Sequence, residues 1–202
     1  MDSITELINI FKQFPGIGPK SARRMAFYLL KKNKRELYNI GKIIATAKNN
    51  LFTCSNCGNI SGSDPCEICS DPLRDKNILC IVEDLETLTA FEHAKIYNGL
   101  YHVLGEIVSP YEEKELSECT INFLLDHVKK NNPDEIIIAT NPKVEGDLTY
   151  YALVEILKNS GLKINKISRL AMGLPMGSTI EFADKLTLHM ALEARTDADL
   201  NL

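Results

Sequence analysis

Hydrophobic residues in the first fifty positions recur at the three- and four-residue spacing of amphipathic helices. The pattern predicts one helix over residues 4–14 and a second that begins at Pro19, because proline is tolerated at the first position of a helix. The segment between them is rich in glycine and proline, which indicates a turn. A third helix is expected to direct the following side chains inward: Leu37, Ile40, Ile43, Ile44 and Ala47.

From residue 77 onward, short continuous apolar runs alternate with stretches of helical spacing. Such runs are typical of parallel strands that are buried on both faces, and the alternation predicts an α/β fold in which helices cover the sheet. The strands are expected at residues 78–82, 100–104, 135–140 and 163–170. The helices are expected at residues 85–97, 113–131, 147–160 and 182–195.

The segment between these two regions, residues 54–69, has almost no apolar residues and contains four cysteines. Cys54 and Cys57 form one C-x-x-C pair, and Cys66 and Cys69 form a second pair eight residues later. Two such pairs can surround one tetrahedral Zn²⁺, and four protein ligands leave no position open for water, which predicts a structural zinc. Disulfides or unliganded thiols are the alternative, but a small apolar-poor insert in a reducing compartment needs a metal to fold.

The other candidate metal ligands lack a ligand-like spacing. Cys80 and Cys119 lie within predicted elements and are expected to be buried thiols. The histidines also lack the spacing of metal ligands, and His102 is expected to be a hydrogen-bonded structural residue. The four histidines are His93, His102, His127 and His189.

The composition, with 45% hydrophobic and 25% charged residues, is that of a folded globular protein and argues against a disordered chain. No apolar run approaches the roughly 20 residues that cross a bilayer, and the chain does not start like a signal peptide. A cytoplasmic protein is therefore expected. The net charge of −4 is unevenly distributed, since residues 1–50 carry +7 and the rest carries −11. A polyanion would meet the N-terminal quarter favourably.

The turn between the first two predicted helices has the sequence PGIG and resembles the helix-hairpin-helix of DNA-binding proteins. Gly16 and Gly18 allow close approach of the backbone, and the N–H groups that open the next helix can hold a phosphate. Lys20, Arg23 and Arg24 would lie beside that phosphate. Phosphate contacts do not read bases, so the expected binding is independent of sequence. An ordinary turn between helices beside a solvated basic face is the alternative.

Polar residues follow two of the predicted strands at the edge where α/β sheets place their sites. This arrangement resembles the Toprim domain of topoisomerases and primases, which sets a glutamate after one strand and an Asp-x-Asp pair after another to hold Mg²⁺. Here Glu83 follows the first strand. Asn141 and Lys143 take the two aspartate positions, and an amide and an ammonium in those places disfavour two-metal catalysis. The residues after the second strand are Asn141, Lys143, Glu145 and Gly146.

Taken in order, these parts resemble the family of bacterial RecR recombination mediators over essentially the whole chain. The resemblance is carried by PGIGPKSARRMAF, the four cysteines, CIVED, LYHVLG, ATNPKVEGD and EFADKLTLHMALEAR. The chain departs from the family pattern at Glu106, at Asp147 and at residues 176–179, which include Ser178 and Thr179. The segment 180–184 looks like the Walker-B-type stretch described for the family; since the chain has no P-loop, a role in subunit contact is expected.

The resemblance implies four parts: a helix-hairpin-helix domain at residues 1–53, a zinc finger at 54–76, a degenerate, Rossmann-like parallel-sheet Toprim domain at 77–175 and a short helical C-terminal segment at 176–202. It further implies a nucleoid-associated mediator that binds single- and double-stranded DNA and loads recombinase on single-stranded gaps. The implied partners are RecO, RecF and further copies of the chain, as a dimer or a ring tetramer. The implied cofactor is one structural Zn²⁺, with no catalytic residue.

Two other functions stay open at this point. One is a metal-dependent Toprim nuclease or topoisomerase-like enzyme that would use Glu83 and Glu145. The other is a protein-binding adaptor without DNA binding.

Overall fold

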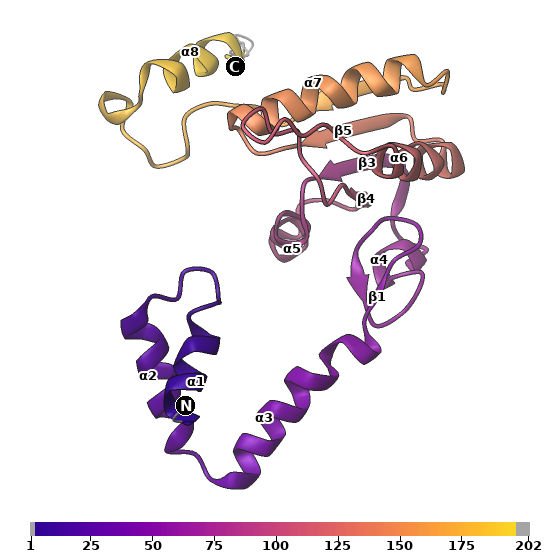
Figure 1. The fold of residues 1–202 in the computed structure, drawn as a ribbon. Coiled ribbons are helices and arrows are strands. Elements are labelled where there is room, and N and C mark those ends of the chain that lie inside the picture. Colours follow the sequence, from indigo (N-terminus) through magenta and orange to yellow (C-terminus); the bar gives the residue numbers. More distant parts are fainter. Residues whose placement is uncertain (1–2, 197–202) are drawn as a thin grey trace. The chain divides into compact units, whose positions relative to one another are not determined.

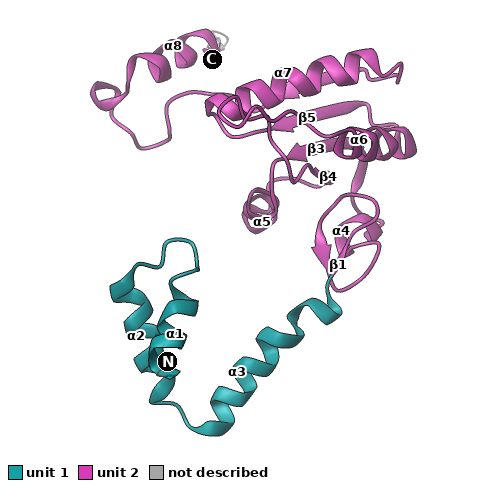
Figure 2. Cartoon of the chain, in the orientation of Figure 1, with its two compact units in different colours: residues 1–51 teal, residues 52–202 magenta. Residues whose placement is uncertain are grey.

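The computed structural model describes residues 3–196, and the chain divides into two compact units, with the boundary along the sequence between Leu51 and Phe52 (Figure 2). The N-terminal unit is helical, and the other unit contains a two-stranded and a four-stranded sheet (Figure 1). Among the described residues, no helix combines the length and apolar character needed to cross a membrane.

The N-terminal unit consists of α1 (Ser3–Phe11), α2 (Pro19–Leu30), α3 (Lys34–Thr46) and a short 3₁₀ turn (Ala47–Asn50). Gly18 occupies the N-cap position of α2 in an extended conformation but provides no side-chain cap, and Pro19 opens the helix, as predicted. Asn33 and Glu36 form a reciprocal capping box that fixes the start of α3.

The prediction of an inward apolar face on α3 is wrong for this unit. No residue of α3 is buried, and Ile43 and Ile44 are 69% and 71% exposed. Helical spacing identifies an apolar face, but it does not show which surface covers that face.

The second unit begins with the cysteine-containing insert, in which two short antiparallel strands precede a single helical turn. These are β1 (Phe52–Thr53), β2 (Ile60–Ser61) and α4 (Glu67–Ser70). A four-stranded sheet in the order β4-β3-β5-β6 follows, and all neighbouring strands are parallel. Its elements are β3 (Asp75–Val82), α5 (Leu85–Ala94), β4 (Gly99–Val103), α6 (Glu118–Asn131), β5 (Glu135–Ala139), α7 (Val144–Asn159) and β6 (Lys166–Arg169). A 3₁₀ turn (Ile180–Phe182) and α8 (Lys185–Glu193) complete the described chain.

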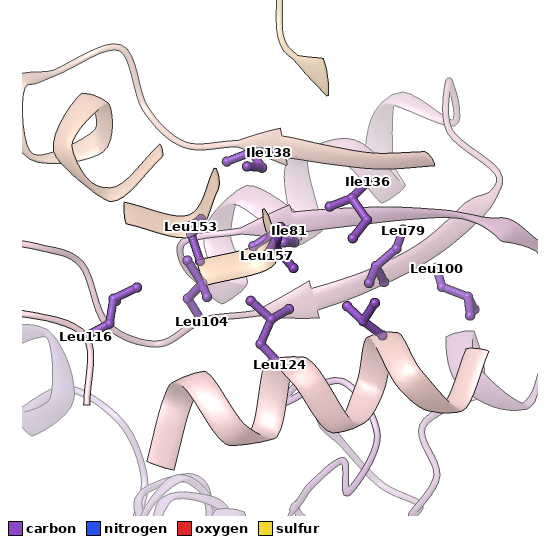
Figure 3. Close-up of a cluster of buried hydrophobic side chains, with 11 residues drawn as sticks. Leu79, Ile81, Leu100, Leu104, Leu116, Leu124, Ile136, Ile138, Leu153 and Leu157 are labelled. Carbon is purple, nitrogen blue, oxygen red and sulfur yellow. The ribbon is translucent and has the colours of Figure 1, made fainter. Parts of the chain in front are cut away.

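Apolar side chains cover both faces of the sheet, so the predicted α/β architecture is confirmed. The larger cluster joins Leu79 and Ile81 of β3 to Leu124 of α6 and to Leu153 and Leu157 of α7 (Figure 3). The other face joins the alternate β3 residues to α5.

Several predicted helix boundaries move because capping residues set the ends. The helix expected to start at residue 113 starts after Ser117, whose hydroxyl accepts from the N–H of Thr120. The helix expected to run to residue 97 ends before Lys95, which adopts a left-handed conformation. The helix expected from residue 147 starts at Val144, which places Glu145 in its first turn rather than in a loop.

Candidate zinc centre, Toprim edge and basic helix

The four predicted zinc ligands converge. The sulfur atoms of Cys54, Cys57, Cys66 and Cys69 all lie within 4.8 Å of one another. The Sγ atoms of Cys57 and Cys66 are 3.6 Å apart, and those of Cys54 and Cys69 are 3.9 Å apart. A tetrahedral site with Zn–S bonds of about 2.3 Å requires S···S separations of about 3.8 Å, whereas a disulfide requires about 2.05 Å. The cluster therefore has the dimensions of a zinc site and not of two disulfides.

Backbone hydrogen bonds shape the first pair of cysteines into a tight knuckle. The N–H of Cys54 donates to Asn59 O at 2.7 Å, and the N–H of Gly58 donates to Cys54 O at 3.0 Å. Gly58 has a φ of +79°, a conformation that suits glycine. The N–H of Cys66 donates to the sulfur of Cys54 at 3.4 Å, which ties the two pairs together.

The electrostatics of the cluster favour a bound cation. The Cys69 thiol and burial raise the pKa of Cys57, and burial raises that of Cys66 to about 11. Burial also acts to raise the pKa of Cys54, but backbone N–H donors, the strongest from Cys66, outweigh it and lower the value to about 7. Four thiolates cannot share this space without a compensating charge, and a divalent metal supplies it. The donor set thus fits Zn²⁺.

The insert is anchored to the edge strand of the sheet. The N–H of Val103 in β4 donates to Cys57 O at 2.8 Å. A Cβ atom at Gly58 would lie only 2.9 Å from Val103 O, so the knuckle approaches the strand as closely as a glycine allows. The zinc module and β4 therefore share a packed contact within the second unit.

At the carboxyl edge of the sheet, the structure brings the predicted Toprim residues together. Glu83, only 8% exposed, accepts a hydrogen bond from the backbone N–H of Asn141 at 2.8 Å through Oε1 and a second from the Asn141 side-chain amide through Oε2. A Cβ at Gly146 would lie 2.0 Å from Asn141 O and 3.0 Å from Glu83 Oε1. Glycine is thus required where α7 passes the Glu83–Asn141 pair.

A recess of about 360 Å³ opens beside this pair. Lys143 and Glu145 line it, together with Ile107, Ser109, Glu112 and Lys114 from the loop that leads to α6. The buried hydroxyl of Thr149 positions this loop, since it accepts from the N–H of Val108 at 2.9 Å and donates to Glu145 O at 2.7 Å. The loop contribution was not evident from the sequence; the one signal was the position of Thr149, one turn beyond Glu145.

The carboxylates of the recess do not form a metal cluster with a third ligand. Among residues 3–196, the four cysteines are the one group of three or more cysteine, histidine or acidic side chains that lie close enough to share an ion. Glu83 and Glu145 belong to no such group.

Two residues at which the chain departs from the family pattern, Glu106 and Asp147, form specific side-chain interactions. Glu106 accepts from the N–H of Ser117 at 3.0 Å and from the hydroxyl of Thr120 at 2.9 Å, and the Ser117 N–H is the main reason that its pKa is lowered. Asp147 forms an ion pair with Arg169, whose guanidinium also lies over the Tyr150 ring at 4.7 Å. Nothing in the structure explains the departure at residues 176–179.

The remaining cysteine and histidine predictions are partly corrected. Cys80 is buried as predicted, but Cys119, in the first turn of α6, is exposed rather than buried. His102 is fully buried, and its Nδ1 lies 3.1 Å from Nδ1 of His127, yet its Nε2 has no hydrogen-bond partner among residues 3–196. Burial lowers the pKa of both imidazoles.

The basic residues predicted to contact DNA lie on α2 of the N-terminal unit. Gly16, in the preceding turn, has a φ of +74°, and Gly18 supplies no side chain to cap the helix N-terminus. Lys20, Arg23 and Arg24 are all exposed. Within the described residues, none of these three cations forms an ion pair or a hydrogen bond. Their charges are therefore available to a bound anion.

Comparison with known protein families gives four matches, which follow each other along the chain. Residues 4–48 match the helix-hairpin-helix model of the RecR family, and residues 51–71 match the four-cysteine zinc finger domain of the same family. Residues 77–168 match the Toprim domain, and residues 173–196 match the RecR C-terminal model. Together with the geometry of the cysteine cluster, the zinc-finger match assigns one structural zinc to the chain.

Proposed function

This chain belongs to the RecR family, whose role is in DNA recombination and repair, and we propose that it is a non-enzymatic mediator that binds DNA through α2 and loads recombinase on single-stranded gaps. The observation that carries the DNA-binding part is the set of three unpaired cations, Lys20, Arg23 and Arg24, beside an uncapped helix N-terminus. Backbone N–H groups at that N-terminus add favourable contacts for a phosphate. Because these contacts address the backbone, both single- and double-stranded DNA are bound without sequence preference.

The double substitution Lys20→Glu with Arg23→Glu tests this interface. We expect strongly weakened DNA binding and a flatter salt dependence, since each lost phosphate contact lowers the log–log slope by roughly 0.9 on duplex DNA and 0.7 on single strands. Lys158→Glu with Lys163→Glu, at exposed positions of the second unit, is the charge-matched control. An unchanged slope in the α2 variant would move the DNA-binding surface elsewhere.

The absence of catalysis is part of the proposal and is supported by the Toprim edge. Both carboxylate oxygens of Glu83 are engaged by Asn141, and Lys143 places an ammonium where a second aspartate would hold Mg²⁺. A nuclease or topoisomerase-like enzyme is the competing function. It predicts Mg²⁺- or Mn²⁺-dependent nicking of supercoiled DNA that Glu145→Gln abolishes, whereas we expect no nicking by either protein.

We place the contact with RecO at the recess beside Glu145, with RecF as a further partner. The recess offers both signs of charge, from Lys114 and Lys143 on one hand and from Glu112 and Glu145 on the other. A partner with complementary charges would be oriented by such a site. Lys143→Glu should weaken capture of RecO, and Lys158→Glu at the far end of α7 should leave it unchanged; equal capture by both variants would place RecO elsewhere.

Self-association into a dimer or a ring tetramer is supported by apolar surface in each unit. The N-terminal unit has a groove of about 870 Å³ lined by Phe14, Tyr28, Ile44 and neighbouring residues. In the other unit, Phe182 and Leu186 are exposed near the C-terminus. Particle masses measured in solution with and without DNA test this part, and a monomer under both conditions would contradict it.

A further inference from the structure

Phe27 lies among the cations of α2, where a core residue would not be expected. The buried residues of α2 are Ala22 and Ala26, whereas Phe27 is 49% exposed. A single exposed apolar residue is common and needs no explanation. The surroundings of Phe27 are what distinguish it.

Phe27 shares one recess with the basic residues. Positions 20, 23, 24 and 27 follow the spacing that places side chains on one face of a helix, so the ring lies one turn, about 5.4 Å, beyond Arg23. Together with Pro19, these four residues line a recess of about 360 Å³. The recess is thus bordered by three cations and by an aromatic ring.

The Phe27 ring is partly covered where it borders the apolar groove of the N-terminal unit, but it takes part in no aromatic pair of the described chain. Within residues 3–196 it makes no ring–ring or cation–π contact, in contrast to the adjacent Tyr28, whose ring is covered by Lys32 at 5.3 Å. A flat apolar surface that is half exposed next to unpaired cations matches the chemistry of one nucleotide: a phosphate for the cations and a base for the ring.

We propose that Phe27 is a stacking platform for an unpaired base, and that it gives α2 a preference for single-stranded over duplex nucleic acid. Proteins that bind single strands without sequence preference combine a basic track with aromatic side chains on which bases stack. In a duplex the bases are stacked on one another, so the ring gains nothing there. This inference rests on the proposed DNA binding by α2 and adds to it the class of nucleic acid.

The test compares three probes of equal length: a thymidine strand, an abasic strand with the same number of phosphates, and a duplex. The full chain, with zinc, should bind the thymidine strand at least about fivefold more tightly than the abasic strand, the lower end of what base–aromatic stacking contributes. Phe27→Ala should remove this ratio and leave the affinity for the abasic strand and the salt slope unchanged. Phe27→Trp should retain the ratio, because tryptophan also offers a π-face.

Tyr38→Ala is the matched control, since Tyr38 is 70% exposed on α3 and lines none of the described recesses. It should leave the ratio at the wild-type value. Circular dichroism of each variant establishes that the helices are retained, and the abasic strand serves as an internal measure of a folded α2.

One result would overturn the inference while leaving DNA binding intact. If Phe27→Ala keeps the wild-type ratio, the ring does not contact a base. A lower particle mass of the same variant in solution would then indicate that Phe27, which also lines the larger apolar groove, contacts a second copy instead. Failure of the proposed function has a different signature, namely a wild-type protein that binds none of the probes or a Lys20→Glu, Arg23→Glu variant that binds all of them normally.

Discussion

The zinc cluster and the Toprim edge lie in the same unit, and each gathers residues that a metal site would use, but they differ in what the residues donate. In the cluster, Cys57 and Cys66 have their sulfurs 3.6 Å apart, and four thiols face one centre. At the Toprim edge, Glu83 and Glu145 line one recess, but an amide and an ammonium stand between them in sequence. The two regions therefore differ in their donor groups, which are four thiols in the cluster and two carboxylates beside an amide and an ammonium at the edge.

The difference arises because a hydrogen bond can replace a metal bond for some ligands and not for others. The amide of Asn141 satisfies the Glu83 carboxylate directly, so the edge is stable without an ion. No neighbouring donor could satisfy four clustered thiolates, so the insert depends on zinc. Structural dependence on a metal is therefore expected in one region and not in the other.

The supports behind the two sites differ as well. Beside the zinc knuckle, Phe123 packs against both Gly58 and His102, and His102 pairs with His127. Behind the Toprim edge, the support is the close approach of Gly146 to Asn141. The variants below remove each site or its support in turn.

Loss of zinc should have the largest effect. Cys57→Ala leaves three ligands, and structural zinc contributes an apparent binding free energy of about 10–16 kcal/mol in zinc-finger peptides, so the insert should unfold. Metal analysis under reducing conditions should find about one zinc per wild-type chain and much less in the variant.

Cys119→Ala is the control for the zinc prediction, because Cys119 is an exposed cysteine outside the cluster. It should retain full zinc content and stability. Wild-type protein without zinc, or a Cys57→Ala variant with wild-type zinc content, would contradict the dependence of the insert on the metal.

Acid should lower the stability contributed by the buried pair His102 and His127 beside the zinc knuckle. Burial lowers the pKa of His102 and His127 below the ordinary 6.5, and His127 is further lowered by Lys130. Below pH 6.5 the unfolded chain binds these protons and the folded chain does not, so the free energy of unfolding falls as the pH falls. The slope is at most about 1.4 kcal/mol per pH unit for each histidine.

His127→Leu should flatten this pH dependence, measured by urea unfolding between neutral pH and pH 5 with zinc in excess. His93→Gln is the control, since His93 is exposed on α5, and it should retain the wild-type slope. An equal slope in wild type and His127→Leu would mean that other groups govern acid stability.

The sequence predicted the zinc ligands fully, because C-x-x-C spacing fixes the geometry locally and needs no knowledge of the rest of the fold. It also predicted the strands and the location of Glu83 and Asn141 at one edge of the sheet, since the carboxyl ends of parallel strands lie at the same edge; the hydrogen bonds between the two residues were not predicted. It missed the start of α7 because Gly146 reads as a loop residue; only the close contact with Asn141 explains a glycine in a helix. The exposed face of α3 and the contribution of Thr149 depend on tertiary packing, which periodicity does not report.

Gly146→Ala should have an intermediate effect. Its Cβ would lie 2.0 Å from a backbone oxygen, so α7 or the Asn141 turn must shift, and overpacking of this kind costs about 1–3 kcal/mol. Gly41→Ala is the matched control, because Gly41 lies within α3 with no atom near its Cβ position, and it should stabilise its helix by about 0.5–1 kcal/mol. Denaturant unfolding measures both changes; a neutral Gly146→Ala would show that the edge is loosely packed.

Restoring the missing ligands should change stability least when Mg²⁺ is present, and it bears most directly on the comparison of the two sites. Asn141→Asp with Lys143→Asp supplies hard oxygen ligands beside Glu83 and removes the ammonium. Without metal, the new carboxylates repel Glu83 and lower the free energy of unfolding. Mg²⁺ at about ten times its dissociation constant should raise the free energy of unfolding again by about 1.4 kcal/mol, with binding visible by calorimetry and absent in the wild type.

Lys158→Asp with Asn159→Asp is the control, because it makes the same charge change at the far end of α7, and it should show no response to Mg²⁺. We expect little DNA cleavage from the restored site, since a metal alone does not position a nucleophile. If the double variant binds no Mg²⁺, the Toprim edge has lost the geometry of a metal site as well as its ligands, and the two regions differ more deeply than in their donor atoms.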